Sequence, residues 1–150
     1  NIGGTSADMG NAVFVAAMLE LPTMAFFTKM SEKINCGTLI KFSILMFCVK
    51  HALTYFATNM IMIYLAQVCQ MFAYALFVPA SVYYVNEKIA VADRVKGQSL
   101  VTTSMTLSGV FANFTGGIML DALGVGHVLL AGVILSIVGA VIVILTTEKV

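Results

Sequence analysis

Charged side chains are scarce in this sequence: Asp, Glu, Lys and Arg together make up 10% of its 150 residues. Soluble domains usually carry about 25% charged residues, so the composition excludes a soluble globular domain and a disordered tail. The net charge is +1 and the basic residues form no cluster, which argues against a nucleic-acid partner. With 60% hydrophobic residues, the composition predicts an integral membrane protein made of helices.

Cysteine and histidine are also few. Cys36 is expected in a connector and Cys48 and Cys69 inside apolar stretches, so we predict no disulfide framework. No pair of Cys or His residues has the spacing of a metal site. Haem would need two axial histidines at one depth, whereas His51 lies within a predicted span and His127 at the end of another. We therefore expect no metal and no cofactor.

The hydrophobic residues occur in long runs. No stretch alternates polar and apolar residues as a barrel strand would, and Pro22 and Pro79 are the two prolines. A bilayer-spanning helix needs about 20 apolar residues. Such stretches lie at about 9–30, 37–57, 60–85, 98–120 and 127–146. The predicted fold class is therefore all-α: a polytopic helical membrane protein with five transmembrane helices.

The basic residues predict how these spans are oriented. They gather at alternate ends of the spans, in the first and third connectors and after the last span: Lys29, Lys33, Lys41, Lys88, Arg94, Lys96 and Lys149. By the positive-inside rule, this side of the cytoplasmic membrane faces the cytoplasm, with Asn1 outside and the C-terminus inside. Because the chain begins outside, at Asn1 and without a targeting segment, we interpret it as the C-terminal part of a longer protein. The alternative is a small five-span protein whose initiator Met is missing.

Among the Asp, Glu, Lys, Arg and His residues, three lie well inside predicted spans and away from their ends, where a charge costs about 2.5–3.5 kcal/mol and marks a candidate functional site. Glu20 precedes Pro22, which frees a backbone carbonyl, and we interpret it as a proton-binding or substrate-binding carboxylate. Its alternative role is a structural carboxylate that locks two helices. Lys50 lies too deep to reach the surface easily, so Glu20 is its expected partner. His51 points about 100° away from Lys50, which favours a helix contact over a proton relay.

A polar stripe marks the third predicted span. Gln67, Gln70 and Tyr74, with Ser81 further along, share one helical face. Two amides and a phenol suit hydrogen bonding to a polar solute, so we interpret the stripe as a cavity lining. The alternative is helix–helix hydrogen bonding, worth about 0.6 kcal/mol per contact. On the fourth predicted span, Asn113 is the candidate solute-binding residue.

Three segments resemble the C-terminal half of a Major Facilitator Superfamily permease. TKMSEKINCG is similar to the family's cytoplasmic loop signature, G-x-x-x-D-R-x-G-R, with Glu32 and Lys33 at its Asp and Arg and with Thr28 and Asn35 in place of its glycines. LFVPASVYYVNEKIAVADRVKGQSL and NFTGGIMLDALG look like the ends of spans ten and eleven in the branch of phenylpropionate permeases, distantly allied to lactose permease. The resemblance covers essentially the whole chain, as spans eight to twelve of twelve.

The resemblance implies a transporter and not an enzyme. In such a transporter, two six-helix halves rock around a site at the middle of the membrane. Glu20 matches an acidic position before the proline of span eight, and Lys50 matches a basic position in span nine. Gln70 replaces a histidine of some relatives, and Ala73 lies near the proton-carrying carboxylate of lactose permease. If transport is proton-coupled, Glu20 or an acid in the missing half would carry the proton.

The partners implied are a small polar substrate, the missing N-terminal half and the lipid bilayer. In this interpretation the stripe residues and Asn113 bind the solute, while Glu20 and Lys50 form a charge pair that rearranges on protonation or substrate binding. The alternative is a non-transporting scaffold or sensor on the same fold, because fold alone does not fix function.

Overall fold

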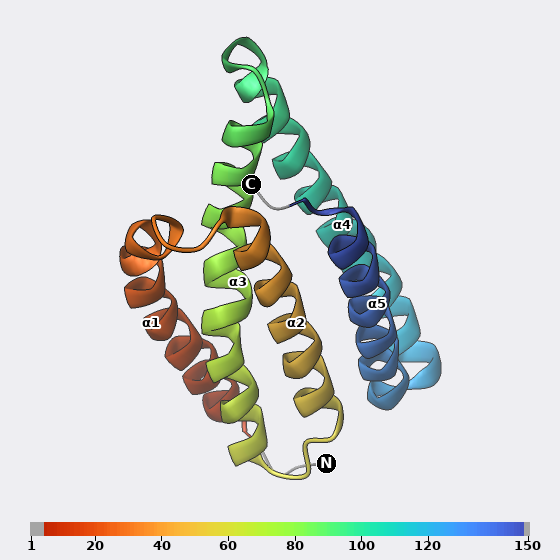
Figure 1. The fold of residues 1–150 in the computed structure, drawn as a ribbon. Helices are drawn as coiled ribbons and strands as arrows, with labels where there is room; N and C mark the ends of the chain where they lie inside the picture. The colour runs from red at the N-terminus through yellow and green to blue at the C-terminus, as the bar shows by residue number, and fades with distance from the viewer. Residues whose placement is uncertain (1–4, 149–150) are drawn as a thin grey trace.

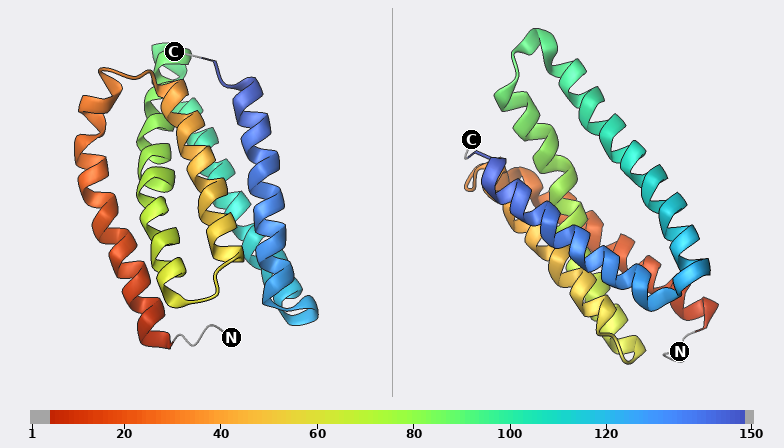
Figure 2. Two further views of the ribbon diagram at one scale, coloured as in Figure 1. Left: turned by 60° about the horizontal axis from the view of Figure 1, so that its bottom comes forward. Right: turned by 90° about the vertical axis from the view of Figure 1, so that its right-hand side faces the viewer.

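A computed structural model describes residues 5–148, which form helices joined by short connectors and contain no strand. The helices, in chain order, are α1 (Ser6–Ser31), α2 (Cys36–Tyr55), α3 (Met60–Lys88), the 3-10 helix η1 (Val91–Asp93), α4 (Arg94–Leu123) and α5 (Val125–Thr146). The α1–α2 and α3–α4 connectors lie towards one end of the bundle, and the α2–α3 and α4–α5 connectors towards the other (Figure 1, Figure 2). The predicted all-α fold is confirmed, and each α-helix begins and ends within a few residues of a predicted span.

Local sequence explains several helix ends. Thr5 caps α1, because its hydroxyl accepts a hydrogen bond from the Asp8 backbone N–H while the Asp8 carboxylate accepts one from the Thr5 N–H. The Asn59 side chain accepts from the Met62 N–H at 3.1 Å and begins α3. Gly124 alone joins α4 to α5, with a φ of +80° that a residue with a Cβ rarely adopts. This single-residue junction turns the chain back on itself.

The core lies among α1, α2 and α3, with α5 packed against α2 (Figure 1). Its buried cluster consists of Phe27, Leu39, Ile40, Leu76 and Ala80. Between α2 and α3, the fully buried Ser43 hydroxyl donates to the Ala73 carbonyl at 2.5 Å. Small residues let two helices approach closely and let a hydroxyl reach the backbone of its neighbour, as in other membrane bundles. The α2–α3 pair is therefore the most tightly joined part of the molecule.

Helix α4 stands further out than the others (Figure 2). It contacts α5 and the end of α3, and none of its residues is buried. Within residues 5–148, α1, α2, α3 and α5 are long and apolar enough to cross a membrane. The sequence predicted a fifth span here. With 30 residues α4 is longer than each of these four helices, but its hydroxyl and amide side chains make it less apolar.

The outer surface of the bundle is rich in large apolar side chains. On α5, for example, Leu135 is 70% exposed and Leu145 is 79% exposed. Apolar surface this extensive is what a helix presents to lipid or to a neighbouring bundle rather than to water. The exposed faces therefore agree with a protein that is integral to a membrane.

Candidate functional site

A charged contact between α2 and α3 lies inside the bundle. The Lys50 ammonium donates a hydrogen bond to the Gln70 side-chain oxygen, with 2.5 Å between Nζ and Oε1. Both residues are half-buried. An ammonium group has three donors, and an amide oxygen accepts without neutralising the charge. Lys50 is thus a positioned cation with donors to spare for a further acceptor.

Glu20 lies on α1, two residues before Pro22, and is half-buried. No ion pair or hydrogen bond joins Glu20 to Lys50, and the ion pairs of residues 5–148 involve Lys88 and Lys96 instead. The structure therefore differs from the sequence-based expectation of a direct Glu20–Lys50 pair. The reason is that α3 lies between α1 and α2 (Figure 1). Gln70 of α3 is therefore the residue that contacts Lys50, and Glu20 of α1 is not.

His51, the next residue along α2, faces a different neighbour. Its Nδ1 lies 2.9 Å from the Phe47 carbonyl oxygen, which accepts a hydrogen bond from that nitrogen, and its ring stacks on the Phe47 ring. On the other side it borders Gly132 of α5. Lys50 and His51 thus point to separate sides of α2, as the helical spacing predicts. This placement suits a helix-contact histidine.

A largely apolar cavity of about 410 Å³ lies beside His51, among α2, α3, α4 and α5. Its walls are formed by Ile44, Phe47, His51, Tyr74, Phe77, Met105, Gly132, Leu135, Ser136 and Gly139. Tyr74 is the residue of the polar stripe that reaches it. The cavity therefore brings together Tyr74 and His51 but neither Lys50 nor Gln70.

The other stripe residues have separate surroundings. Gln67 is half-buried, and the Ser81 hydroxyl donates to the Val78 carbonyl of its own helix at 2.7 Å. From Gln67 to Ser81 the stripe rises about 21 Å along α3, so its members meet different neighbouring helices. The residues of the polar stripe therefore do not form a single site, although they share one face of α3.

The remaining candidates lie away from this centre. Asn113 is exposed on α4, where its amide donates to the Gly109 carbonyl at 2.8 Å. Glu32 and Lys33 are exposed in the α1–α2 connector, and Glu32 ends α1 as its C-cap residue. The structure brings none of these three to Lys50. No group of three possible metal ligands occurs within residues 5–148.

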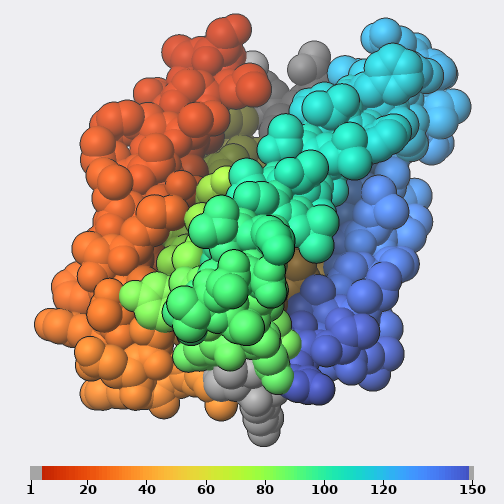
Figure 3. Space-filling model, turned by 90° about the horizontal axis from the view of Figure 1, so that it is seen from above, coloured from red at the N-terminus to blue at the C-terminus, as the bar shows by residue number. Residues whose placement is uncertain are grey.

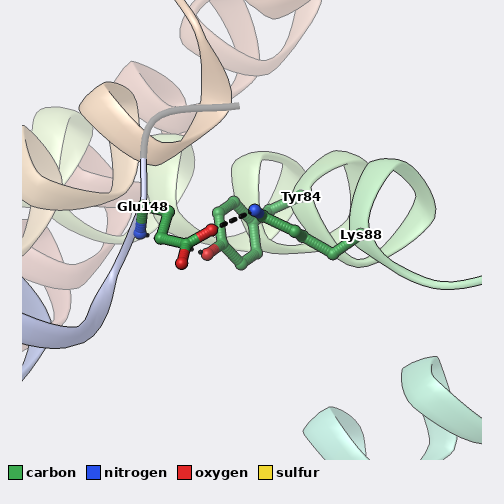
Figure 4. A network of polar contacts seen from close by, with 3 residues as sticks. All are labelled: Tyr84, Lys88 and Glu148. Carbon is green, nitrogen blue, oxygen red and sulfur yellow. Dashed lines mark hydrogen bonds and ion pairs between the residues drawn. The ribbon is translucent and has the colours of Figure 1, made fainter.

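A polar contact that the sequence did not reveal joins the ends of α3 and α5 (Figure 4). Lys88 forms an ion pair with Glu148, and the Tyr84 hydroxyl accepts a hydrogen bond from the Glu148 backbone N–H at 3.3 Å. The hydrogen bond from Lys88 holds the pKa of the Glu148 carboxyl below its usual range. Because Glu148 follows the last helix, no periodic pattern could have linked it to Lys88. The contact places the ends of α3 and α5 together.

Comparisons with known proteins identify the family. The family model of the Major Facilitator Superfamily matches residues 1–150, the whole chain. No curated protein and no solved structure matches the chain. The match confirms, at the level of the superfamily, the resemblance drawn from the connectors and span ends. Together with the apolar helices and the intramembrane polar contact, it establishes that this chain belongs to the Major Facilitator Superfamily of membrane transporters.

Proposed function

We propose that the protein moves a small polar solute across the cytoplasmic membrane by alternating access, with proton coupling through Glu20. The observation that carries this proposal is the Lys50–Gln70 hydrogen bond inside the bundle. Lys50 of α2 and Gln70 of α3 are joined within the bundle, and Glu20 lies on α1, the other neighbour of α3. Such a group is costly in a membrane and is usually retained because it handles a solute or an ion.

The chemistry of the group suits a solute that accepts hydrogen bonds. Lys50 has donors left after its contact with Gln70, and the Gln70 amide nitrogen supplies two more. Glu20 has no ion-pair partner among residues 5–148, and we assign the coupling proton to its carboxylate. A change in the charge of Glu20 alters the electrostatic field at Lys50 and therefore changes how tightly Lys50 binds the solute.

The proposal includes a second half that is not in this chain. No residue of α4 is buried, and no side-chain hydrogen bond within residues 5–148 occupies the hydroxyls of Ser99, Thr102 and Thr103, which can therefore donate to water or to a protein partner. In transporters built from two halves, the path runs between them. We therefore place α4 beside the path, as a fifth span, with an N-terminal half facing it. The ends rich in Lys and Arg face the cytoplasm in this arrangement.

The test is transport by the full-length protein in proteoliposomes, using a panel of radiolabelled sugars, nucleosides and aromatic acids. For a solute that accumulates under a proton gradient, Glu20→Gln should abolish gradient-driven uptake and leave counterflow exchange intact. Glu87→Gln, at an exposed position near the end of α3, is the matched control and should transport normally. Retention of gradient-driven uptake in Glu20→Gln would refute the role of Glu20. Failure of every solute to move would favour a scaffold or sensor.

A further inference from the structure

A shallow cleft lies at the corner where α3 ends and α4 begins, and most of the residues that line it have polar side chains. Its volume is about 500 Å³, and its lining consists of Asn86, Arg94, Val95, Gln98, Ser99, Thr102 and Thr103. The two helices diverge from this corner (Figure 2), and Figure 3, which looks down on the same end, shows α4 running across the exposed surface of the molecule. The cleft is separate from the Lys50–Gln70 contact, which none of its residues touches.

Arg94 supplies an unneutralised cation to this cleft. Its Nε is buried and has no hydrogen-bond partner in the part of the chain that the structure describes. Its guanidinium also belongs to neither ion pair of residues 5–148, since Lys96 takes Asp93 and Lys88 takes Glu148. A guanidinium has five N–H donors and no acceptor, so only an acceptor can satisfy it. The missing partner of Arg94 is therefore an oxygen-bearing group, and a negatively charged one suits it best.

The hydroxyl groups beside Arg94 are also free to bind a ligand. Further along α4, the hydroxyls turn back and donate to the carbonyl four residues earlier, in Thr106, Ser108 and Thr115. Within residues 5–148, no such side-chain bond occupies the three hydroxyls that line the cleft, those of Ser99, Thr102 and Thr103. The hydroxyls of Ser99, Thr102 and Thr103 can therefore donate to a ligand in the cleft.

The frame of the cleft is held by Gln98. Its side-chain nitrogen donates to the Val82 carbonyl at 2.8 Å and to the Asn86 side-chain oxygen at 3.4 Å. These bonds tie the first turns of α4 to α3 across the cleft. Because its oxygen already accepts from Gln98, Asn86 has its NH₂ group left to donate. The polar groups that line the cleft are thus mainly donors.

We propose that this cleft binds a phosphate group, carried by an anionic lipid headgroup or by a free phosphate. A phosphate offers several acceptor oxygens, which match the forked guanidinium of Arg94 together with the hydroxyls around it. Basic pockets between helices at a membrane boundary are suited to phosphate headgroups. The proposal does not depend on which solute the protein transports.

The test is calorimetric titration of the full-length protein, in uncharged detergent, with short-chain phosphatidylglycerol and, separately, with inorganic phosphate. Arg94→Gln should weaken binding by at least about tenfold, as expected when charge-assisted hydrogen bonds to an anion are lost. Lys96→Gln is the matched control, because Lys96 lies on the same first turns but pairs with Asp93 and does not line the cleft. It should change binding by no more than about twofold.

Each outcome has a defined meaning. Binding of phosphatidylglycerol alone supports the cleft as a lipid site, and binding of inorganic phosphate as well supports it as a site for phosphate itself. The proposal would be overturned if neither probe binds, or if Arg94→Gln and Lys96→Gln weaken the binding of a probe equally. If Arg94→Gln does not fold, Thr103→Val removes one hydroxyl of the cleft and should still weaken binding.

Discussion

The Lys50–Gln70 hydrogen bond predicts a strongly non-additive pair of mutations. Gln70→Leu leaves the Lys50 ammonium without its acceptor inside the bundle, and Lys50→Met leaves the Gln70 amide without its donor. A hydrogen bond to a charged group contributes about 1.5–3 kcal/mol, and an unsatisfied buried group costs about 1–3 kcal/mol. Each single variant should therefore lower the free energy of unfolding by about 1–3 kcal/mol.

The double variant Lys50→Met/Gln70→Leu should be nearly as stable as the wild type. Both partners are then replaced by apolar side chains of similar size, and such replacements are often neutral or stabilising. The sum of the single effects should exceed the double effect by about 1 kcal/mol or more. Half-burial of both residues sets the lower end of this range, because water or lipid headgroups can reach them in part.

The assay is equilibrium unfolding of the full-length protein in mixed micelles by titration with a denaturing detergent, followed by circular dichroism for all four proteins. Additivity within about 0.3 kcal/mol would refute the reasoning, because it would mean that the two side chains do not depend on each other. Ser43→Ala in the same α2–α3 interface is the control. It should destabilise the protein by a similar amount in the presence and absence of Gln70→Leu.

Two further predictions concern the end of the bundle near Glu148. A Cβ on Gly97 would lie 2.9 Å from Cγ1 of the stiff Val85 side chain, so Gly97→Ala should cost about 1–3 kcal/mol by overpacking, against about 1 kcal/mol gained from helix propensity. In the control Gly126→Ala, the new Cβ meets nothing within 4 Å, so this variant should have a higher midpoint of thermal unfolding than Gly97→Ala. Equal midpoints for the two variants would exclude the close approach of Gly97 to Val85. Because Lys88 lowers the pKa of Glu148, their ion pair should persist from neutral pH to below the ordinary range of a glutamate and break as the pH falls through that lowered pKa. In Lys88→Gln, a carboxyl ¹³C titration should show the Glu148 pKa back at its ordinary value, and an unchanged titration would disprove the contact.

Features that depend on local sequence were predictable. Helix lengths follow from apolar runs, and the ends follow from caps such as Thr5 with Asp8 and from the turn at Gly124. The opposite directions of Lys50 and His51 follow from the 100° step of an α-helix. For these, no knowledge of the neighbouring helices was needed.

Features that depend on the order and angle of helices were not predictable. The acceptor for Lys50 is Gln70 and not Glu20 because α3 lies between α1 and α2, an order that the sequence does not encode in any single segment. The cleft around Arg94 depends on the divergence of α3 and α4, and its signal in the sequence was only a charge in a connector. Tertiary arrangement decided both.

The measurement that tests the central claim most directly is uptake by proteoliposomes that contain either wild-type protein or the Lys50→Met/Gln70→Leu double variant. The claim is that these two side chains bind the solute. The double variant should fold as stably as the wild type and yet fail both to accumulate and to exchange a solute that the wild type transports. Uptake by the double variant at the wild-type rate would contradict the claim, because the solute would then cross without either side chain.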